Sequence, residues 1–504
     1  MAQVSSAPMR PAYFPLLTIA AWTSIVLCVA LLSGMVMLTQ FYTPRKTEIS
    51  RGEYLNLNIT AKTVVSLPLN DSAKEAQIEL LATGPLEQRY AHAILLGEID
   101  GPERALEQLK EIDAAVKKKL QDDSPANPEQ DAAKDTKANA KVTATSGFPS
   151  EIQSRIREIT GALYQQYSQG DFDTSTVPDE DRDFLVEQMG FVGRLALLPE
   201  DSTDQAARKQ IEEESTAVFN RTVIAAILGF FAFLAAIFAA ATLYGLWYFR
   251  QSKSHFVDQS NRGFVYLETF AGWLAIFIAL QLGIAVVLGP FAEILLLYVG
   301  PAIFFVSLLA LVWPVVRGVP VSVMLDDIGW NLRNPLKEIL VGGFCYLGLL
   351  IPLFFGLVLT VFLEHQTTTL FPPGEFESRT ITSHPIEEEI ASGDPTVWIM
   401  MFVATVVAAP IVEETFFRGV LYRYLRDATG KRFSQVASIA ISAIANGVMF
   451  AAIHPQGILA IPVLASLAIG FSLVREWRGS IIAPMVMHAI HNGIITTVAI
   501  TMMG

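Results

Sequence analysis

Charged side chains are scarce in this chain. They make up 17% of its 504 residues, whereas soluble domains usually have about 25%. Hydrophobic residues make up 52%, and the mean hydropathy is +0.41, which excludes an ordinary soluble globular protein. Basic residues are outnumbered, 36 against 49 acidic ones, and form no basic stripe, so a nucleic-acid-binding protein is excluded too.

Cysteine is nearly absent as well. The two cysteines, Cys28 and Cys345, both lie in long apolar runs. This placement excludes a disulfide-stabilised scaffold, and it leaves the redox compartment of the polar segments undefined.

Several long stretches lack Asp, Glu, Lys and Arg altogether, and about 20 apolar residues suffice for a helix to cross a bilayer. The uncharged run 433–474 has 42 residues and must hold two spans, separated by the turn signal at 454–457. The first run is too long for a signal peptide and is interpreted as an uncleaved anchor. We therefore expect an all-α polytopic membrane protein with about nine transmembrane helices. The expected spans are about 15–39, 222–249, 265–289, 291–316, 339–363, 396–412 running on past Glu413, 434–453, 457–474 and 480–503.

One long polar block interrupts this pattern. Residues 43–216 contain 20 basic and 32 acidic residues, a net charge of −12, whereas the other 330 residues have a net charge of −1. Apolar residues recur at helical spacing in 83–119, across a Gly-Pro turn at 101–102, and again in 150–199, which predicts helices. The segment 121–147 has almost no large apolar residues and is predicted to be a disordered linker.

The chain is therefore expected to have four parts. They are an N-terminal membrane anchor (1–42), a small acidic, mostly helical extramembrane domain (43–216), additional transmembrane helices (217–337) and a membrane core with the motifs described below (338–504).

Basic residues in the short loops set the expected orientation. With the N-terminus in the cytoplasm, the cytoplasmic loops hold thirteen Lys and Arg, and the opposite short loops and C-terminal tail hold one, Arg379. This places domain 43–216, loop 364–394 and the C-terminus on the outer face, as in an integral protein of a bacterial inner (plasma) membrane. The thirteen are Arg250, Lys253, Arg262, Arg317, Arg333, Lys337, Arg418, Arg423, Arg426, Lys431, Arg432, Arg475 and Arg478.

Ionisable side chains within spans cost at least about 2.5–3.5 kcal/mol each on insertion scales, so each needs a reason to be there. They gather near the C-terminus, where three of the seven histidines also lie. The motifs are Glu-Glu-x-x-x-Arg at 413–418, Phe-x-x-x-His at 450–454 and His-x-x-x-Asn at 488–492.

Helical spacing indicates a role for each motif. Glu414 and Arg418 stand at i and i+4 with the acid first, the favourable order for an ion pair, so Glu414 is expected to be neutralised and structural. Glu413 points about 100° away, and an acid without a local partner in a low-dielectric site suits general base work. His488 and Asn492 share one helix face, where both can donate to one substrate oxygen as an oxyanion hole.

Taken together and in this order on successive spans, the motifs resemble the CPBP intramembrane proteases, the family of the type II CAAX prenyl endopeptidases and bacteriocin-processing relatives. Pro410, Phe417 and Gly419 around the first motif also look like the family. The resemblance covers roughly 338–503 and implies an intramembrane endopeptidase. It implies that the hydrolytic water is activated by Glu413 and His454, that the tetrahedral intermediate is stabilised by His488 and Asn492, and that the site is braced by Glu414 and Arg418.

The cofactor remains open at this point. Members of the family are often described as metalloproteases, which makes Glu413, His454 and His488 candidate ligands of zinc or another divalent metal. The His-Glu-x-x-His spacing that makes zinc binding legible from sequence is missing, so direct activation of water is the alternative. His491 lies outside the family's minimal pattern, as a supporting or packing residue.

Depth presents a difficulty. At about 1.5 Å per residue, Glu413, His454 and His488 lie at different heights on straight helices. We expect either a kink at Pro410, or an extension of 418–432 into the cytosol with tilted neighbours, to bring them together.

A second class of function stays open: a transporter or non-catalytic membrane scaffold with domain 43–216 as its partner-binding module. A transporter should show an internal repeat, but 222–363 holds no second copy of the motifs, which favours the protease. The expected partners are a membrane protein or lipidated peptide as substrate, the lipid bilayer, and a protein partner for domain 43–216.

The orientation leads to a first prediction, which cysteine labelling tests. Cysteines introduced near 130 and in 364–394 should react with a membrane-impermeant maleimide in intact cells, because these segments lie on the outer face. Cysteines in 253–262 and 423–432 should react only after permeabilisation. Labelling of both sets from the same side would contradict the orientation.

Overall fold

The computed structural model describes residues 13–41, 51–122, 149–249, 262–288, 292–332, 334–370 and 395–503. Regular secondary structure within these ranges is helical throughout, which confirms the expected all-α class. The chain forms two compact units. One, the polar unit, comprises 44–227 and 370–380; the other, the bundle unit, comprises 1–43, 228–369 and 381–504.

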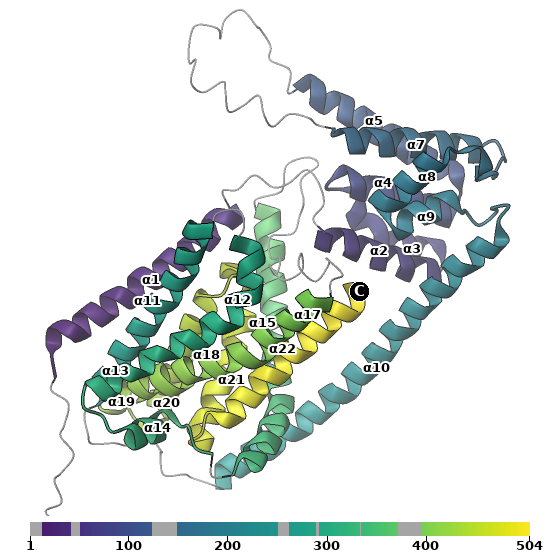
Figure 1. Ribbon diagram of the computed structural model, residues 1–504. Helices are drawn as coiled ribbons and strands as arrows, with labels where there is room; N and C mark the ends of the chain where they lie inside the picture. Colours follow the sequence, from purple (N-terminus) through teal and green to yellow (C-terminus); the bar gives the residue numbers. More distant parts are fainter. Residues whose placement is uncertain are drawn as a thin grey trace, which may run out of the picture. The chain divides into compact units, whose positions relative to one another are not determined.

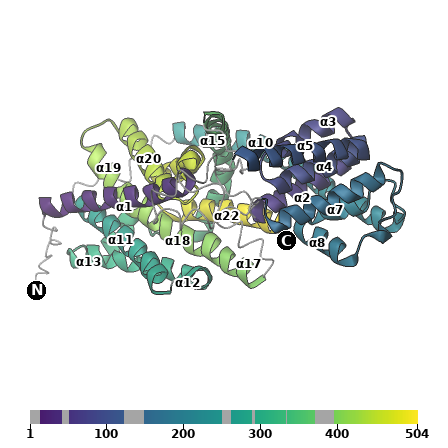
Figure 2. The ribbon, with the colours of Figure 1, turned by 90° about the horizontal axis from the view of Figure 1, so that it is seen from above.

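Nine helices in the described ranges are long and apolar enough to cross a membrane by length and composition, as expected. The first five are α1 (Pro15–Phe41), α10 (Gln205–Phe249), α11 (Gly263–Leu288), the continuous α12, η4 and α13 (Ala292–Ser307, Leu308–Leu311, Val312–Val316), and α15 (Pro335–Leu370). The others are α17 to α19 (Pro395–Gly430), α20 (Gln435–Ala452), η7 with α21 (Ile458–Ala460, Ile461–Arg478) and α22 (Ile482–Met503). In Figures 1 and 2, α1 lies along α11.

The polar unit is a set of short helices. The expected turn at 101–102 is confirmed, because Gly101, at φ 95°, separates α4 from α5. The segment 150–199 is broken into four helices instead of forming a continuous one, and two helices before residue 80 were not expected at all. Apart from its first two residues, linker 121–147 lies outside the described residues. The helices are α2 (Arg51–Ser66), α3 (Asp71–Ile78), η1 (Glu79–Ala82), α4 (Leu86–Asp100), α5 (Pro102–Asp122), α7 (Glu151–Tyr167), η2 (Thr174–Thr176), α8 (Asp179–Met189) and α9 (Phe191–Leu197).

Side chains from distant parts of the chain satisfy the backbone of the polar unit. The Asn58 side chain accepts hydrogen bonds from the backbone N–H groups of Phe191 and Val192, at 2.6 and 3.3 Å, and so completes the start of α9. The Tyr164 hydroxyl donates to the Ile94 carbonyl at 3.2 Å. These contacts hold the broken segment 150–199 against α2 and α4.

An aromatic layer forms the centre of the bundle unit. The rings of Trp273 on α11 and Phe416 stack with centroids 4.6 Å apart, and Phe417 meets Phe450 edge to face at 5.1 Å. All four side chains are at most 1% exposed. Because the Trp273 indole also donates to the Ser307 hydroxyl at 3.0 Å, this layer ties α11 and α12 to the helix that carries the first motif.

A short helix outside the motif region also packs on that helix. It is α14 (Val321–Ile328), which ends at Gly329. The approach is close at Gly419, where a Cβ atom would lie 3.0 Å from the Ile328 carbonyl oxygen. A side chain at this position would have to push Ile328 outward, so glycine suits this contact. The Trp330 indole adds a hydrogen bond to the Thr415 hydroxyl at 3.1 Å.

The second prediction concerns His92 on α4, which is 7% exposed and whose buried Nδ1 has no hydrogen-bond partner among the described residues. Burial, helped by the Arg104 charge, lowers the pKa of His92 to about 4. Unfolding restores a pKa of about 6.5, so the unfolded chain binds more protons between pH 6.5 and 4 and the unit loses stability across that window.

Pulse proteolysis in urea, read on the 43–216 fragment of the solubilised chain, measures this loss. The His92→Leu variant should show a flatter dependence on pH between 6.5 and 4 than wild type, and Arg104→Gln an intermediate one. Equal pH dependence in wild type and His92→Leu would contradict the assignment.

Candidate active site

The sixth span is not a regular α-helix. Within Pro395–Gly430, two π turns, η5 (Val403–Ala408) and η6 (Glu414–Leu421), flank the α-helical turn α18 (Ala409–Glu413), and α19 (Tyr422–Gly430) follows. The expected kink at Pro410 is therefore replaced by two widened turns on either side of it. Such turns are rare and are frequently found at functional sites.

Side chains from other helices donate to carbonyl groups of both π turns. The Asn446 amide donates to the Phe417 carbonyl at 2.7 Å, and the Asn492 amide donates to the Thr405 carbonyl at 2.7 Å. The Ser472 hydroxyl donates to the side-chain oxygen of Asn446, Oδ1, at 3.2 Å. Asn446 was not identified from the sequence, although an Asn inside an uncharged span is a signal that could have found it.

Glu414 is the most buried acid of the site. One of its oxygens, Oε1, lies 2.9 Å from Arg418 Nη1 and 3.0 Å from His488 Nδ1, and the Glu414 and Arg418 side chains are both 0% exposed. The expected ion pair is therefore present, with His488 as an additional partner. The Arg418 guanidinium lies between the rings of Phe450 and Phe471, at 4.6 and 5.0 Å, and donates to the Ala468 carbonyl.

Glu413, His454 and His488, which straight helices would place at different depths in the membrane, lie close together in the structure. Glu413 Oε2 lies 3.9 Å from His454 Nε2 and 4.0 Å from His488 Nε2. This oxygen is buried, and no hydrogen-bond partner for it lies among the described residues. The Nδ1 atoms of both rings are engaged elsewhere: that of His488 with Glu414, and that of His454 with the Phe450 carbonyl at 2.6 Å. Both Nε2 atoms are thereby directed toward Glu413.

Asn492 and His491 are placed differently from each other. Asn492 shares α22 with His488, and one of its two amide N–H groups is taken by the Thr405 carbonyl. The other N–H group of this amide is a second hydrogen-bond donor, which is the kind of group that an oxyanion hole needs. His491 Nδ1 lies 3.2 Å from the Tyr346 hydroxyl on α15, so this residue connects α22 to a helix outside the motifs.

Several basic residues assigned to cytoplasmic loops are buried in the bundle unit. Arg426 pairs with Glu476 at 2.8 Å, Arg423 lies 3.5 Å from Asp327, and Arg475 donates to the Asp327 carbonyl at 3.0 Å. With Arg418, these side chains are at most 4% exposed. They hold helices together inside the protein, which differs from their interpretation as solvated loop charges.

The geometry gives no support for a bound metal. Within the described ranges, no group of three or more His, Cys, Asp and Glu side chains is arranged to hold a metal ion. The candidate ligand atoms of Glu413, His454 and His488 stand 3.9 and 4.0 Å apart, wider than ligands about 2.0–2.2 Å from a tetrahedral zinc would stand. As arranged, the donor set does not fit a metal.

Three candidate membrane spans bring the Glu413 carboxylate and the His454 and His488 imidazoles together, and ionisable groups gathered inside spans mark a functional site. Residues 395–494 match the family model described as Rce1-like, type II CAAX prenyl endopeptidase Rce1-like. This match confirms the resemblance to the CPBP intramembrane proteases and supports intramembrane endopeptidase activity in general. No curated protein and no solved structure matches the chain.

A third prediction follows from the burial of Glu414. The variant Glu414→Gln leaves Arg418 without its counter-charge, and breaking a buried pair costs about 3–5 kcal/mol. We expect a clear fall in the midpoint of thermal unfolding of the purified protein and in its level in the membrane. Glu213→Gln, which breaks an exposed pair with Lys209, is the control and should change stability by less than about 1 kcal/mol. An unchanged midpoint in Glu414→Gln would contradict the structural role.

Proposed function

We propose that this chain hydrolyses a peptide bond of a membrane-associated protein or peptide, with Glu413 and His454 activating water and His488 and Asn492 stabilising the oxyanion. The observation that carries the proposal is the convergence of two Nε2 atoms on Glu413 Oε2, a buried oxygen with no hydrogen-bond partner in the part of the chain that the structure describes. Atoms about 4 Å apart can share one water molecule, since each hydrogen bond to it needs about 2.8 Å.

In the proposed reaction, Glu413 carries a proton from the attacking water to the leaving nitrogen. A water between Glu413 and His454 attacks the carbonyl carbon and gives one proton to the Glu413 carboxylate. The carbonyl oxygen becomes an oxyanion. As the tetrahedral intermediate collapses, the C–N bond breaks and the proton passes from Glu413 to the leaving nitrogen, which yields a carboxylic acid and an amine.

The oxyanion needs donors held in place beforehand. His488 would supply an Nε2–H, and the contact of its Nδ1 atom with Glu414 Oε1 at 3.0 Å holds the ring in place. Asn492 would supply its second amide N–H. In this scheme Glu414 and Arg418 brace the site without contacting the substrate.

We also propose the membrane, the orientation and the kind of substrate with which this chain acts. The charge asymmetry of the loops favours a bacterial inner-membrane protein with a cytoplasmic N-terminus and with domain 43–216 and the C-terminus outside. Of those thirteen basic residues, four are buried, and six others that the structure describes are not: Arg262, Arg317, Lys337, Lys431, Arg432 and Arg478. Domain 43–216 then serves as a partner-binding module, and a prenylated protein is one candidate substrate among membrane-associated polypeptides.

A fourth prediction separates the two adjacent glutamates. Glu413→Gln keeps the shape of the side chain but removes the base, so activity should fall by about 10²–10⁴-fold while protein level and unfolding midpoint stay normal. The measurement compares peptide fragments in native membranes that express wild type or the variant. Glu364→Gln, on α15 outside the site, is the control and should leave the fragments unchanged. A Glu413→Gln variant with full activity would contradict the proposal.

The same assay tests the alternative with a metal. Purified wild type treated with a chelator should keep its activity if the residues act directly on water. Activity that is lost on chelation and restored by zinc, together with zinc binding that disappears in His454→Ala, would replace the water scheme by a metal-dependent one.

A further inference from the structure

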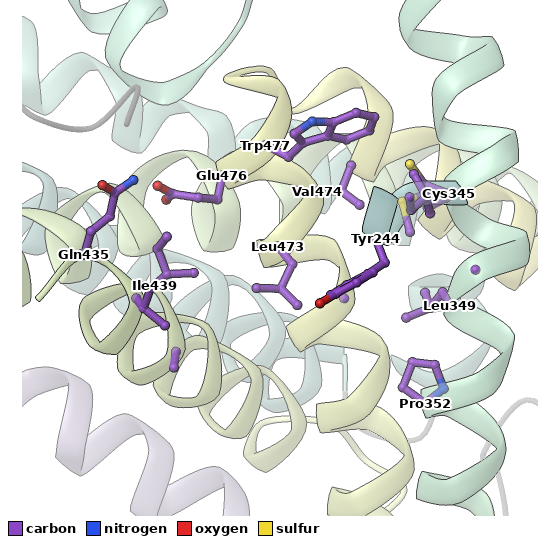
Figure 3. Close-up of a pocket in the computed structure, with 16 residues that line it drawn as sticks. Tyr244, Cys345, Leu349, Pro352, Gln435, Ile439, Leu473, Val474, Glu476 and Trp477 are labelled. Carbon is purple, nitrogen blue, oxygen red and sulfur yellow. The ribbon is translucent and has the colours of Figure 1, made fainter. Parts of the chain in front are cut away.

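A cavity of about 960 Å³, whose lining does not include Glu413, lies in the bundle unit (Figure 3). It lies between the end of α10, the first half of α15, the first turns of α20 and the last turns of α21. Its volume is at the upper end of the roughly 300–1,000 Å³ usual for ligand sites. Figure 3 shows the Tyr244 ring between Leu473 on one side and Cys345 and Leu349 on the other. The lining is mostly apolar, as a hydrocarbon chain requires.

The cavity opens toward lipid. The helices α10, α15, α20 and α21 are all candidate membrane spans, so their outward faces lie against acyl chains. At the mouth, Tyr244 is 65% exposed, Val436 67% and Leu473 45%. A chain from the surrounding bilayer can therefore enter without crossing water.

Polar groups gather where α20 begins and α21 ends. Trp477 lines the cavity, and its buried indole N–H has no acceptor among the described residues. The Glu476 carboxylate at the same end is taken by Arg426 at 2.8 Å and by the Tyr422 hydroxyl at 3.1 Å. An unmatched donor beside a neutralised acid favours a ligand that brings an acceptor oxygen.

The charge next to this end is positive. Lys431 and Arg432 lie three and two residues before the Ser434 cap of α20, and both are exposed, although Lys431 pairs with Asp427 at 3.1 Å. The N-terminus of an 18-residue helix adds a partial positive charge at Gln435, which lines the cavity. Basic residues beside an apolar span attract the anionic headgroups of the cytoplasmic leaflet.

We propose that this cavity binds an anionic phospholipid of the bilayer, with an acyl chain between Leu349, Ile439 and Leu473 and the phosphate and ester oxygens at the end marked by Arg432 and Trp477. Cationic charge, an unmatched donor and a lipid-facing apolar chamber occur together there. The proposal is independent of the hydrolytic function.

The occupant would nevertheless lie close to the candidate active site. Met487 and Gly470 line the cavity, and the residues that follow them, His488 and Phe471, belong to the site, with their rings 5.4 Å apart. A filled cavity supports the backs of α21 and α22 at this level. Lipid composition should therefore affect how firmly His488 is held.

Fluorescence quenching by chain-brominated lipid tests the proposal on the full chain in vesicles. The Trp477 signal is the difference between wild type and Trp477→Phe. We expect brominated phosphatidylglycerol to quench it more strongly than brominated phosphatidylcholine at equal content. Equal quenching by the two lipids would mean ordinary contact with bulk lipid and would overturn the proposal.

Two variants with matched controls locate the site. Ala440→Phe fills the cavity and should abolish the preference for phosphatidylglycerol, whereas Ile441→Phe, exposed on α20 but outside the lining, should keep it. Arg432→Gln should raise the phosphatidylglycerol content needed for half-maximal quenching about fivefold, whereas Lys337→Gln should not. If Ala440→Phe fails to fold, Arg432→Gln decides. A preference unchanged in either variant would overturn the proposal.

Discussion

The bundle unit depends on one buried carboxylate. Glu414 Oε1 contacts both Arg418 and His488, and the Arg418 charge could not be buried at this depth without a counter-charge. Once Arg418 is neutralised, its flat guanidinium can lie between Phe450 and Phe471, which places α20 and α21 around η6. The same carboxylate fixes the orientation of the His488 ring and so requires α22 to approach. One oxygen thus connects the four helices that carry the site.

Backbone hydrogen bonding is the second constraint. Inside a bilayer no water is present to form hydrogen bonds with backbone N–H and C=O groups. Irregular turns are therefore stable there only where other protein groups form these hydrogen bonds. The side-chain amides of Asn446 and Asn492 donate hydrogen bonds to carbonyl groups of η6 and η5, and the Trp330 indole donates one to the hydroxyl of Thr415 in η6. Polar residues of neighbouring helices therefore stabilise the widened turns that carry the motif.

Much of this architecture could be predicted from the sequence, because its physics is local. Uncharged runs indicate spans, and residues four apart lie roughly 30–40° from alignment in both α and π geometry, so the Glu414–Arg418 pair was expected although the helix type was not. Nothing in 414–421 distinguishes a π turn, because it depends on partners such as Asn446 from another helix. Arg475 was taken for a loop residue because its hydrogen-bond acceptors, the backbone carbonyl groups of Arg418 and Asp327, come from distant segments. The contacts of the site match the expected residues, while their catalytic roles stay predictions.

The two π turns also determine where the sixth span can tolerate the insertion or deletion of a residue. A turn bonded from i to i+5 holds one residue more than an α turn, so a deletion inside Val403–Ala408 can return it to α geometry without rotating the helix beyond it. The regular helix Tyr422–Gly430 has no extra residue to lose. A deletion there rotates the part of the span before the deletion by about 100° relative to the part after it. Tolerance to insertions and deletions along this span therefore follows the type of helix rather than the depth in the membrane.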